Sequence, residues 1–324
     1  MSTVSAGIGF IHCVLPDKLV EVGELPEVPL LGREEAEFAG GSGVRTVGVF
    51  PDTPTAELAA MACREPAGGR PGERADILLL VAPRAPDVLL GSDVCRVQAA
   101  CGFGPSFAFT VDGLGCAGSS VAWGLAADLL AADPSRERVL IAHASRPTGV
   151  DRVRYPVTVI GDGAYAMTVE RGGRPVLRAH RVRTDGEFHD LFSVDYKRVP
   201  WYEWREECDS PDRYRFELAM RSRLELGALV DLVLTDAGVA KDAVTATVMQ
   251  NVTASAYSFY ESLLGLPIHP VCGEHLASYG HLGAMDVVLN LDRLLASGDV
   301  SGGDLVLVLN NSPVAAWAAT LWEV

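Results

Sequence analysis

The segment "DGLGCAGSSVAWGLAADLL", residues 112–130, determines how the rest of the chain is interpreted. It places Cys116 between small residues, after a strand-like run and at the start of an apolar helix expected over residues 116–132. Free backbone N–H groups and the helix dipole at such a position favour a thiolate. The flanking glycines allow a sharp strand-to-helix turn that exposes the sulfur, as in the nucleophile elbow of hydrolases. Cys116 is therefore a candidate nucleophile, and the alternative is a buried core residue.

The overall composition fits a globular protein of one large or two ordinary domains. The chain has 324 residues, of which 48% are hydrophobic, and a formal net charge of −15. Such an acidic balance argues against a nucleic-acid binder and against adhesion to anionic membranes. No run reaches the ~18 uninterrupted apolar residues of a membrane span, and no basic stretch with an apolar core opens the chain. The seven cysteines are scattered without metal-ligand spacing, so we expect free thiols, no metal and a cytoplasmic location.

Strand-like and helix-like segments alternate along most of the chain. Continuous apolar runs at 75–83 and 138–145 are typical of strands buried on both faces. A second series follows, with a long helix ended by Gly238, a strand at 246–252 and closing strands from 304 onward. Residues 157–170 suggest a strand pair around a glycine turn, and residues 171–211 a connection or an insertion between two halves. This alternation predicts a layered α/β protein.

Four stretches together resemble the β-ketoacyl-ACP synthase III family of thiolase-like condensing enzymes. They are the nucleophile region at 109–130, an Arg-containing strand with a Gly-Asp-Gly-Ala turn at 152–170, a Tyr-Gly helix start at 274–295, and the closing strands at 303–324. The resemblance implies a thiolase-like fold of two similar fused halves in a five-layered αβαβα architecture. We place the halves at residues 1–175 and 176–324, and expect a homodimer with Cys116 as the nucleophile.

The sequence departs from that family at both partners of its nucleophile. The family's His-Gln-Ala-Asn motif is matched by a stretch without histidine, in which Gln250 and Asn251 follow a methionine. The family's Tyr-Gly-Asn motif is matched by a Tyr-Gly pair followed by His281. Decarboxylative condensation needs fixed donors for an enolate-like oxygen, and losing one such donor costs roughly 10²–10³ in rate. Carbon–carbon bond formation is therefore not expected.

What remains is a thiol, an imidazole and a carboxylate, because Asp286 follows His281 by five residues. Cys116, His281 and Asp286 would form an acyl-transfer triad, and "GHLGAMD" resembles the acyltransferase branch of the family in natural-product pathways. Three alternatives stay open: His281 as a packing residue, Asp286 as an ordinary first-turn acid of a helix, and His275 as the functional histidine. His143 is interpreted as a core residue.

The resemblance also implies the substrates. The donor would be an acyl or aroyl thioester on phosphopantetheine, from CoA or an acyl carrier protein, with no permanently bound cofactor. The acceptor would be a second carrier protein or a small-molecule hydroxyl or amine. Arg154 matches a family position near the CoA head, while Gln250 and Asn251 are candidates to line the pocket. The basic stretches at 178–183 and 213–223 are candidates to dock an acidic carrier protein. The alternative function is a starter-unit condensing enzyme for a polyketide.

Two further features stay unassigned in the sequence. The family takes a second oxyanion-hole N–H from a turn before the last strand, and here that turn is "NNSPVAAW", residues 310–317. Pro313 has no N–H to donate, so the donor would be a neighbouring backbone group or an asparagine side chain. The aromatic segment 192–205 would shape an acceptor pocket or pack between the halves.

Overall fold

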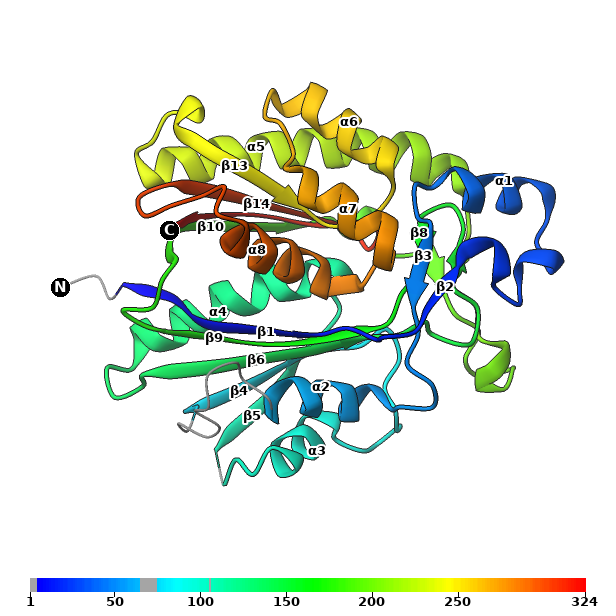
Figure 1. The fold of residues 1–324 in the computed structure, drawn as a ribbon, viewed down its shortest axis with the longest axis horizontal. Coiled ribbons are helices and arrows are strands. Elements are labelled where there is room, and N and C mark those ends of the chain that lie inside the picture. The colour runs from blue at the N-terminus through cyan, green and yellow to red at the C-terminus, as the bar shows by residue number, and fades with distance from the viewer. Residues whose placement is uncertain (1–4, 65–74, 105) are drawn as a thin grey trace.

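A long mixed sheet organises the molecule, and its strands come from both ends of the chain (Figure 1). The computed structural model describes residues 5–64, 75–104 and 106–324. In these residues the sheet has nine strands in the order β13-β14-β15-β10-β1-β9-β6-β4-β5. Their bounds are β1 Ala6–Val14, β4 Ile77–Val81, β5 Phe107–Val111, β6 Arg138–Ser145, β9 Gly163–Arg171, β10 Val176–Thr184, β13 Val244–Met249, β14 Leu305–Ser312 and β15 Ala316–Glu323.

The two parts of this sheet repeat one pattern of order and direction. From β1 outward, β9 and β6 pair antiparallel, and β4 and β5 then pair parallel. From β10 outward, β15 and β14 pair antiparallel and β13 pairs parallel, followed by an isolated parallel bridge between Thr247 and Ile268. The parts meet where Gly7 pairs with Val176. The boundary expected at residues 175/176 falls between β9 and β10, and the division into two units stays a prediction.

Helices cover both sheet parts and fill the space between them, which gives five layers (Figure 1). Helix α5 packs on β10 and β15, α4 and α8 lie between the two sheet parts, and α2 and α3 cover the far face. The helices are α1 Arg33–Gly41, α2 Thr55–Arg64, α3 Asp93–Ala100, α4 Gly118–Ala132, α5 Ala219–Ala237, α6 Ala254–Leu264, α7 Pro270–Tyr279 and α8 Asp286–Ser297. This arrangement is the expected αβαβα architecture.

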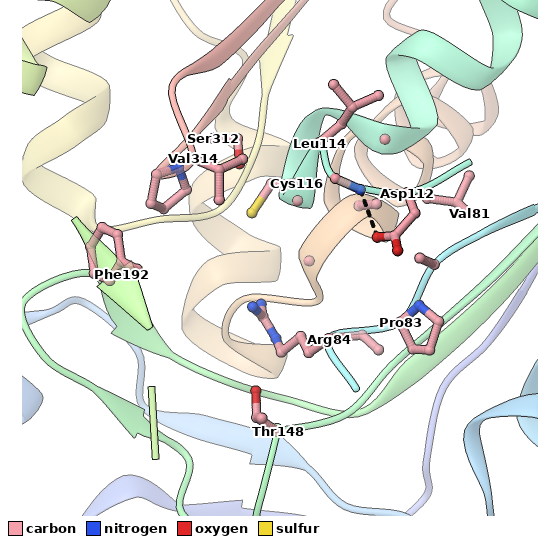
Figure 2. Close-up of a pocket in the computed structure, with 18 of the residues that line it drawn as sticks. Val81, Pro83, Arg84, Asp112, Leu114, Cys116, Thr148, Phe192, Ser312 and Val314 are labelled. Carbon is pink, nitrogen blue, oxygen red and sulfur yellow. Dashed lines mark hydrogen bonds between the residues drawn. The ribbon is translucent and has the colours of Figure 1, made fainter. Parts of the chain in front are cut away.

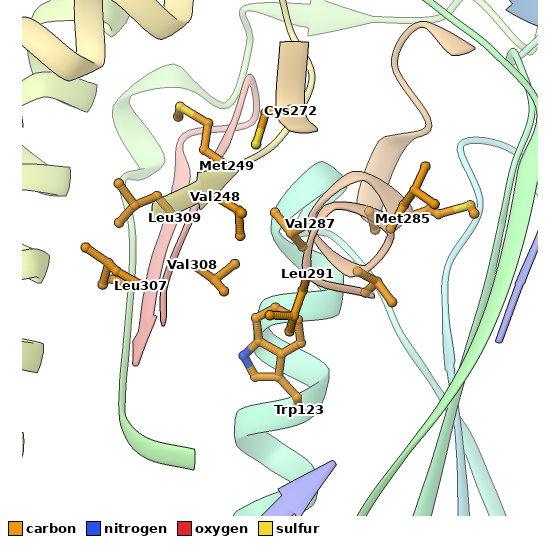
Figure 3. Close-up of a cluster of buried hydrophobic side chains, with 14 of the residues drawn as sticks. Trp123, Val248, Met249, Cys272, Met285, Val287, Leu291, Leu307, Val308 and Leu309 are labelled. Carbon is orange, nitrogen blue, oxygen red and sulfur yellow. The ribbon is translucent and has the colours of Figure 1, made fainter. Parts of the chain in front are cut away.

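The core between the middle helices and the second sheet part is mainly apolar. Trp123 of α4 and Leu291 of α8 face Val308 of β14 (Figure 3), and each is fully buried. Residues 115–132 are long and apolar enough to cross a membrane by composition alone, but more than half of this segment is buried inside the molecule. The apolar character of α4 is therefore explained by its position between two sheets.

Most elements expected from the sequence are present. The long helix ends at Gly238, which has a left-handed backbone conformation, and the expected strands at 75–83, 138–145 and 246–252 correspond to β4, β6 and β13.

Two expectations were wrong, and two helices were missed. Residues 171–211 are not simply a connection, because they contain β10, a strand inside the main sheet. Residues 157–170 do not form a strand pair, because β8 (Thr158–Val159) pairs with β7 (Val153–Arg154) and β9 joins the main sheet. Helices α1 and α7 were not anticipated. The remaining short strands are β2 Leu19–Glu21, β3 Thr46–Gly48, β11 Phe192–Ser193 and β12 Glu207–Cys208.

Candidate active site

Cys116 lies in a single 3-10 turn, η3 (Gly115–Ala117), that leads directly into α4. Gly115 has φ +51°, a left-handed conformation that favours glycine. The Asn310 side chain donates a hydrogen bond to the Cys116 carbonyl at 2.8 Å and so fixes the turn from the second sheet part. Cys116 is 3% exposed. The strand-to-helix position expected from the sequence is confirmed.

His281 approaches Cys116 from the loop between α7 and α8. Its Nε2 atom lies 3.1 Å from the Cys116 Sγ atom. Backbone contacts hold the loop in place, because the His281 N–H donates to Val159 and the His281 carbonyl accepts from Gly161, at 2.9 and 3.1 Å. His281 is therefore held against the first half of the chain, although it lies 165 residues after the cysteine.

Asp286 is the first residue of α8 and completes the set. Its Oδ2 atom lies 2.5 Å from the His281 Nδ1 atom and accepts the Asn251 N–H at 2.9 Å. Its Oδ1 atom accepts the Leu282 N–H at 2.7 Å. The helix N-terminus further favours the negative charge. Asp286 is fully buried, so this charge is compensated by hydrogen bonds and by the imidazole rather than by water.

The electrostatics of the three groups favour a thiolate–imidazolium pair. Burial lowers the pKa of His281, but the charges of Asp286 and Cys116 outweigh it and raise the pKa to about 9. Burial raises the pKa of Cys116, but the His281 charge and hydrogen bond outweigh it and, with Arg84 and Arg154, bring the pKa below its ordinary value. Both shifts favour the transfer of the Cys116 proton to His281.

A cavity of about 310 Å³ opens beside Cys116 (Figure 2). Phe192 and Val314 contribute apolar surface, whereas Arg84, Arg154 and Glu206 contribute charge. Arg154 forms a buried ion pair with Glu206 and lies over the Phe192 ring, 4.8 Å from its centroid. The expected substrate-binding residue Arg154 thus lines the cavity, in a buried position.

Gln250 and Asn251 are not among the residues that line this cavity, but Gln250 lines a neighbouring cavity that shares Pro313 with it, so the role of both residues in substrate binding stays a prediction. Gln250 exchanges two hydrogen bonds with the Asn311 backbone, at 3.0 and 3.1 Å. The Asn251 side-chain carbonyl accepts hydrogen bonds from Tyr257 and Asn290 at 3.0 and 2.8 Å. Both are buried polar residues that hydrogen-bond within the second half, although the side-chain nitrogen of Asn251 has no partner. Asn251 contacts Asp286 through its backbone N–H.

The other candidate histidines lie at different places relative to the cavity. His275 hydrogen-bonds Asn290 at 2.7 Å and does not line the cavity, so it is not the functional histidine at this site. His143 lies on the cavity wall, and its Nε2 atom is buried without a partner.

Arg84 and Glu206 were missed by sequence reasoning, because isolated charged residues in loops carry no local pattern. In the turn before β15, Ser312 also lines the cavity and its hydroxyl has no partner.

The basic stretches proposed for carrier docking are largely neutralised by acidic neighbours. Arg181 and Arg183 of β10 pair with Asp236 and Glu225 at 2.6 and 2.8 Å. Arg221 pairs with Asp185 at 2.9 Å. Neither stretch forms an uncompensated basic patch at these positions. No group of three or more metal-ligating side chains was found within residues 5–64, 75–104 and 106–324.

Comparison with known proteins agrees with this geometry. The family model described as 3-oxoacyl-[acyl-carrier-protein (ACP)] synthase III C terminal matches residues 234–324. The β-ketoacyl-[acyl-carrier-protein] synthase III of Desulfotalea psychrophila is 25% identical over 99% of each chain, and that of Synechocystis is 22% identical over 75% of each chain. The chain is therefore similar to β-ketoacyl-[acyl-carrier-protein] synthase III proteins over its whole length, and the resemblance found in the sequence is confirmed.

Solved structures of similar proteins extend over nearly the whole synthase III-like chain. The structure described as ChlB3, an acyltransferase, has a TM-score of 0.83 and 25% identity, and covers 99% of this chain and 98% of its own. The 3-oxoacyl-(acyl carrier protein) synthase III of Pseudomonas aeruginosa has a TM-score of 0.81 and 19% identity, with 98% of each chain covered. The thiolase-like fold expected from the sequence is confirmed.

Proposed function

We propose that this synthase III-like protein is an acyltransferase that works through a Cys116 thioester. It would take an acyl or aroyl group from a carrier protein or CoA and pass it to a second carrier protein, or to a small-molecule hydroxyl or amine. The observation that carries this proposal is the continuous chain of contacts from the Cys116 sulfur through His281 to Asp286. Thiol, imidazole and carboxylate in that order form an acyl-transfer triad.

In the first half-reaction, the Cys116 thiolate attacks the thioester carbonyl of the donor. A bond forms between the Cys116 sulfur and the acyl carbon, and the bond to the phosphopantetheine sulfur breaks. The His281 imidazolium gives its Nε2 proton to the leaving thiolate and becomes neutral. Its Nε2 atom is already 3.1 Å from the reacting sulfur. The products are acyl-Cys116 and a free phosphopantetheine thiol.

In the second half-reaction, neutral His281 removes the proton from the acceptor hydroxyl, amine or thiol as it attacks the Cys116 thioester. The acyl carbon is released from the Cys116 sulfur, which leaves as a thiolate. The imidazolium that forms is stabilised by Asp286, whose carboxylate is held by two backbone N–H groups. The thiolate–imidazolium pair is thereby regenerated.

The same contacts argue against decarboxylative condensation. That reaction needs neutral donors directed at a developing enolate oxygen. His281 is instead tied to a carboxylate that keeps it protonated, and no asparagine is among the described residues lining the cavity. A starter-unit condensing enzyme remains the second candidate, because the Desulfotalea and Synechocystis relatives are named as ketoacyl synthases.

The wider role proposed is in polyketide-type natural-product biosynthesis in the cytoplasm, with no permanently bound cofactor. The similarity to the ChlB3 acyltransferase supports transfer chemistry.

We also propose a homodimer. Strand β5 is the edge of the main sheet, and Phe107 on it is 61% exposed. An exposed edge strand with aromatic side chains is suited to pairing with a second copy.

The deciding experiment incubates the purified protein with a panel of acyl-CoA and acyl-carrier thioesters and follows intact mass and peptide maps. Wild type is compared with Cys116→Ala, His281→Ala and the surface control Arg33→Met on α1. We expect an acyl adduct on Cys116 that is absent in Cys116→Ala and unchanged in the control. In His281→Ala, we expect the adduct to persist, because the acyl group is not transferred to acceptors. An absence of adduct from every donor would refute the proposal. Malonyl-dependent chain extension with loss of CO₂ would favour the condensing enzyme.

A further inference from the structure

Arg84 presents unused hydrogen-bond donors at the wall of the Cys116 cavity. It follows β4 in the first half, and Figure 2 shows its side chain directed into the cavity from the side opposite Cys116. Its Nη1 atom lies 3.6 Å from Glu206, whereas its Nε and Nη2 atoms are buried without a partner. Nε and Nη2 form the side edge of the guanidinium, which can hold one oxygen group with two N–H donors.

His143 presents an unused acceptor in the same wall. Its Nδ1 atom lies 3.0 Å from the Val81 carbonyl oxygen, which can only accept, so the ring proton is on Nδ1. Burial lowers the pKa of His143 to about 4, and the ring is neutral. We therefore assign the lone pair to the Nε2 atom, which is buried without a hydrogen-bond partner although the Leu282 backbone also lies near the ring.

Gly283 shows that these atoms converge. A Cβ atom built on this glycine would lie 3.6 Å from Arg84 Nη2 and 3.5 Å from His143 Nε2. It would also lie 3.5 Å from the Ser145 hydroxyl. Gly283 itself lines the cavity and has no side chain to fill this position. A donor from the loop after β4 and an acceptor from β6 thus lie close to one another around Gly283, two residues after His281, where the missing side chain leaves room beside them.

We propose that the acyl group carried by Cys116 bears a hydroxyl group, which Arg84 and His143 recognise together. This inference rests on the acyltransferase function proposed above and specifies its substrate class. A hydroxyl accepts from the Arg84 fork and donates to His143 Nε2, so both buried groups become satisfied. A ketone or carboxylate would accept from Arg84, but it would place a second acceptor against the His143 lone pair. A methyl group would leave Arg84 and His143 without a hydrogen-bond partner.

Arg84 has a competing role that must be separated from recognition. Its charge contributes to lowering the pKa of Cys116, and this effect would change acylation by all substrates equally. Recognition of a hydroxyl instead changes the ratio of rates between a hydroxylated acyl group and its deoxy analogue. The ratio is therefore the readout, and a purely structural role for Arg84 or His143 would not alter it.

The test measures the burst of Cys116 acylation, without acceptor, by intact mass. The probes are paired pantetheine thioesters: butanoyl with 3-hydroxybutanoyl, propanoyl with 2-hydroxypropanoyl, and benzoyl with its three hydroxy isomers. In wild type we expect at least one hydroxylated member to react about tenfold or more faster than its partner. Arg84→Met and His143→Phe should bring that ratio close to one. Arg84→Lys keeps the positive charge but not the paired N–H donors of the guanidinium. It should lose the preference for the hydroxylated probe while retaining a higher acylation rate than Arg84→Met. Arg33→Met, at an exposed arginine of α1, should keep both the ratio and the rate.

The outcomes separate this inference from the proposed function. Absence of any adduct on Cys116 overturns both. Adducts that form equally well with hydroxylated and deoxy probes overturn the hydroxyl assignment alone, and mean that water occupies the position beside Gly283. A hydroxyl preference that appears only when the adduct is discharged assigns the hydroxyl to the acceptor and likewise overturns it. Each variant is compared at equal folded fraction, measured by thermal unfolding, so that a poorly folded variant is not scored as a loss of recognition.

Discussion

The Nδ1 atom of His281 and the Oδ2 atom of Asp286 are 2.5 Å apart, and both side chains are almost fully buried. Asp286 is not free to turn away, because two backbone N–H groups also bind its carboxylate. The pair therefore fixes both the orientation of the imidazole and the nitrogen that faces Cys116. This relationship distinguishes the site from one in which the histidine serves only as a neutral donor.

Replacing Asp286 by Asn keeps the size of the side chain but removes the charge that stabilises the imidazolium, and it puts an NH2 donor where one of the two oxygens accepts a backbone N–H. We expect the rate of transfer from acyl-Cys116 to acceptor to fall by about 10²- to 10⁴-fold. Single-turnover discharge of a preformed adduct measures this step directly. A near wild-type discharge rate in Asp286→Asn would assign the carboxylate to helix stability alone.

The thiolate–imidazolium pair predicts two different pH profiles. Alkylation of Cys116 by iodoacetamide needs only the thiolate, so its rate should rise through the lowered pKa of Cys116 and then stay constant. Donor cleavage also needs the imidazolium proton, so it should fall as the pH rises through about 9, where His281 loses that proton. In His281→Ala, burial is no longer offset by the imidazolium, and the alkylation profile should move to higher pH. Coincident profiles in wild type and His281→Ala would contradict the ion pair.

The sequence was informative wherever a side chain's role follows from its own neighbours in the chain. The Gly-Cys-Ala-Gly turn and the apolar helix after it predicted the position of Cys116 at a strand-to-helix junction, as observed. The apolar runs predicted β4 and β6, because strands buried on both faces need no alternation. Bringing His281 to Cys116 from 165 residues away depended on the family resemblance, since spacing alone does not define a tertiary contact.

Other features depended on partners that the sequence does not reveal. Strand β10 has an arginine-rich sequence that does not look like a strand of a main sheet. It can lie there because Arg178, Arg181 and Arg183 form ion pairs with acidic residues of β15 and α5. Gln250 was expected to face the substrate, but the Asn311 backbone offers it two hydrogen bonds. Arg84 is recognisable as a cavity residue only when its missing partners can be seen.

Gly115 is the glycine on which the nucleophile turn depends. Its φ of +51° disfavours any other residue, and a Cβ atom there would lie 2.5 Å from the Ser312 hydroxyl. Gly115→Ala should therefore displace either the turn or the β14–β15 connection and slow acylation of Cys116 by tenfold or more, about the factor of a ~1.4 kcal/mol barrier change. Gly302→Ala, at an exposed glycine with nothing within 4 Å, is the matched control. Equal acylation rates in the two variants would show that the turn tolerates a side chain.

Asp162, in the Gly-Asp-Gly-Ala turn, is predicted to stabilise the fold rather than to act in catalysis. It is fully buried, with oxygens 2.8 and 3.0 Å from two nitrogens of Arg152, and it accepts the Phe50 N–H at 2.9 Å. Removing one partner of a buried pair leaves an uncompensated charge, so Asp162→Ala should lower the free energy of unfolding by about 3–5 kcal/mol.

Urea unfolding measures this change, with Asp236→Ala as the control, because the partly exposed Asp236–Arg181 pair should contribute at most about 1 kcal/mol. The double variant Asp162→Ala/Arg152→Met removes the orphaned cation and should recover part of the loss, since residues in direct contact are not additive. If the stability lost in the double variant equals the sum of the losses in Asp162→Ala and Arg152→Met measured separately, the ion pair itself carries no coupling energy. The turn would then owe its stability to the hydrogen bond with Phe50 and to packing.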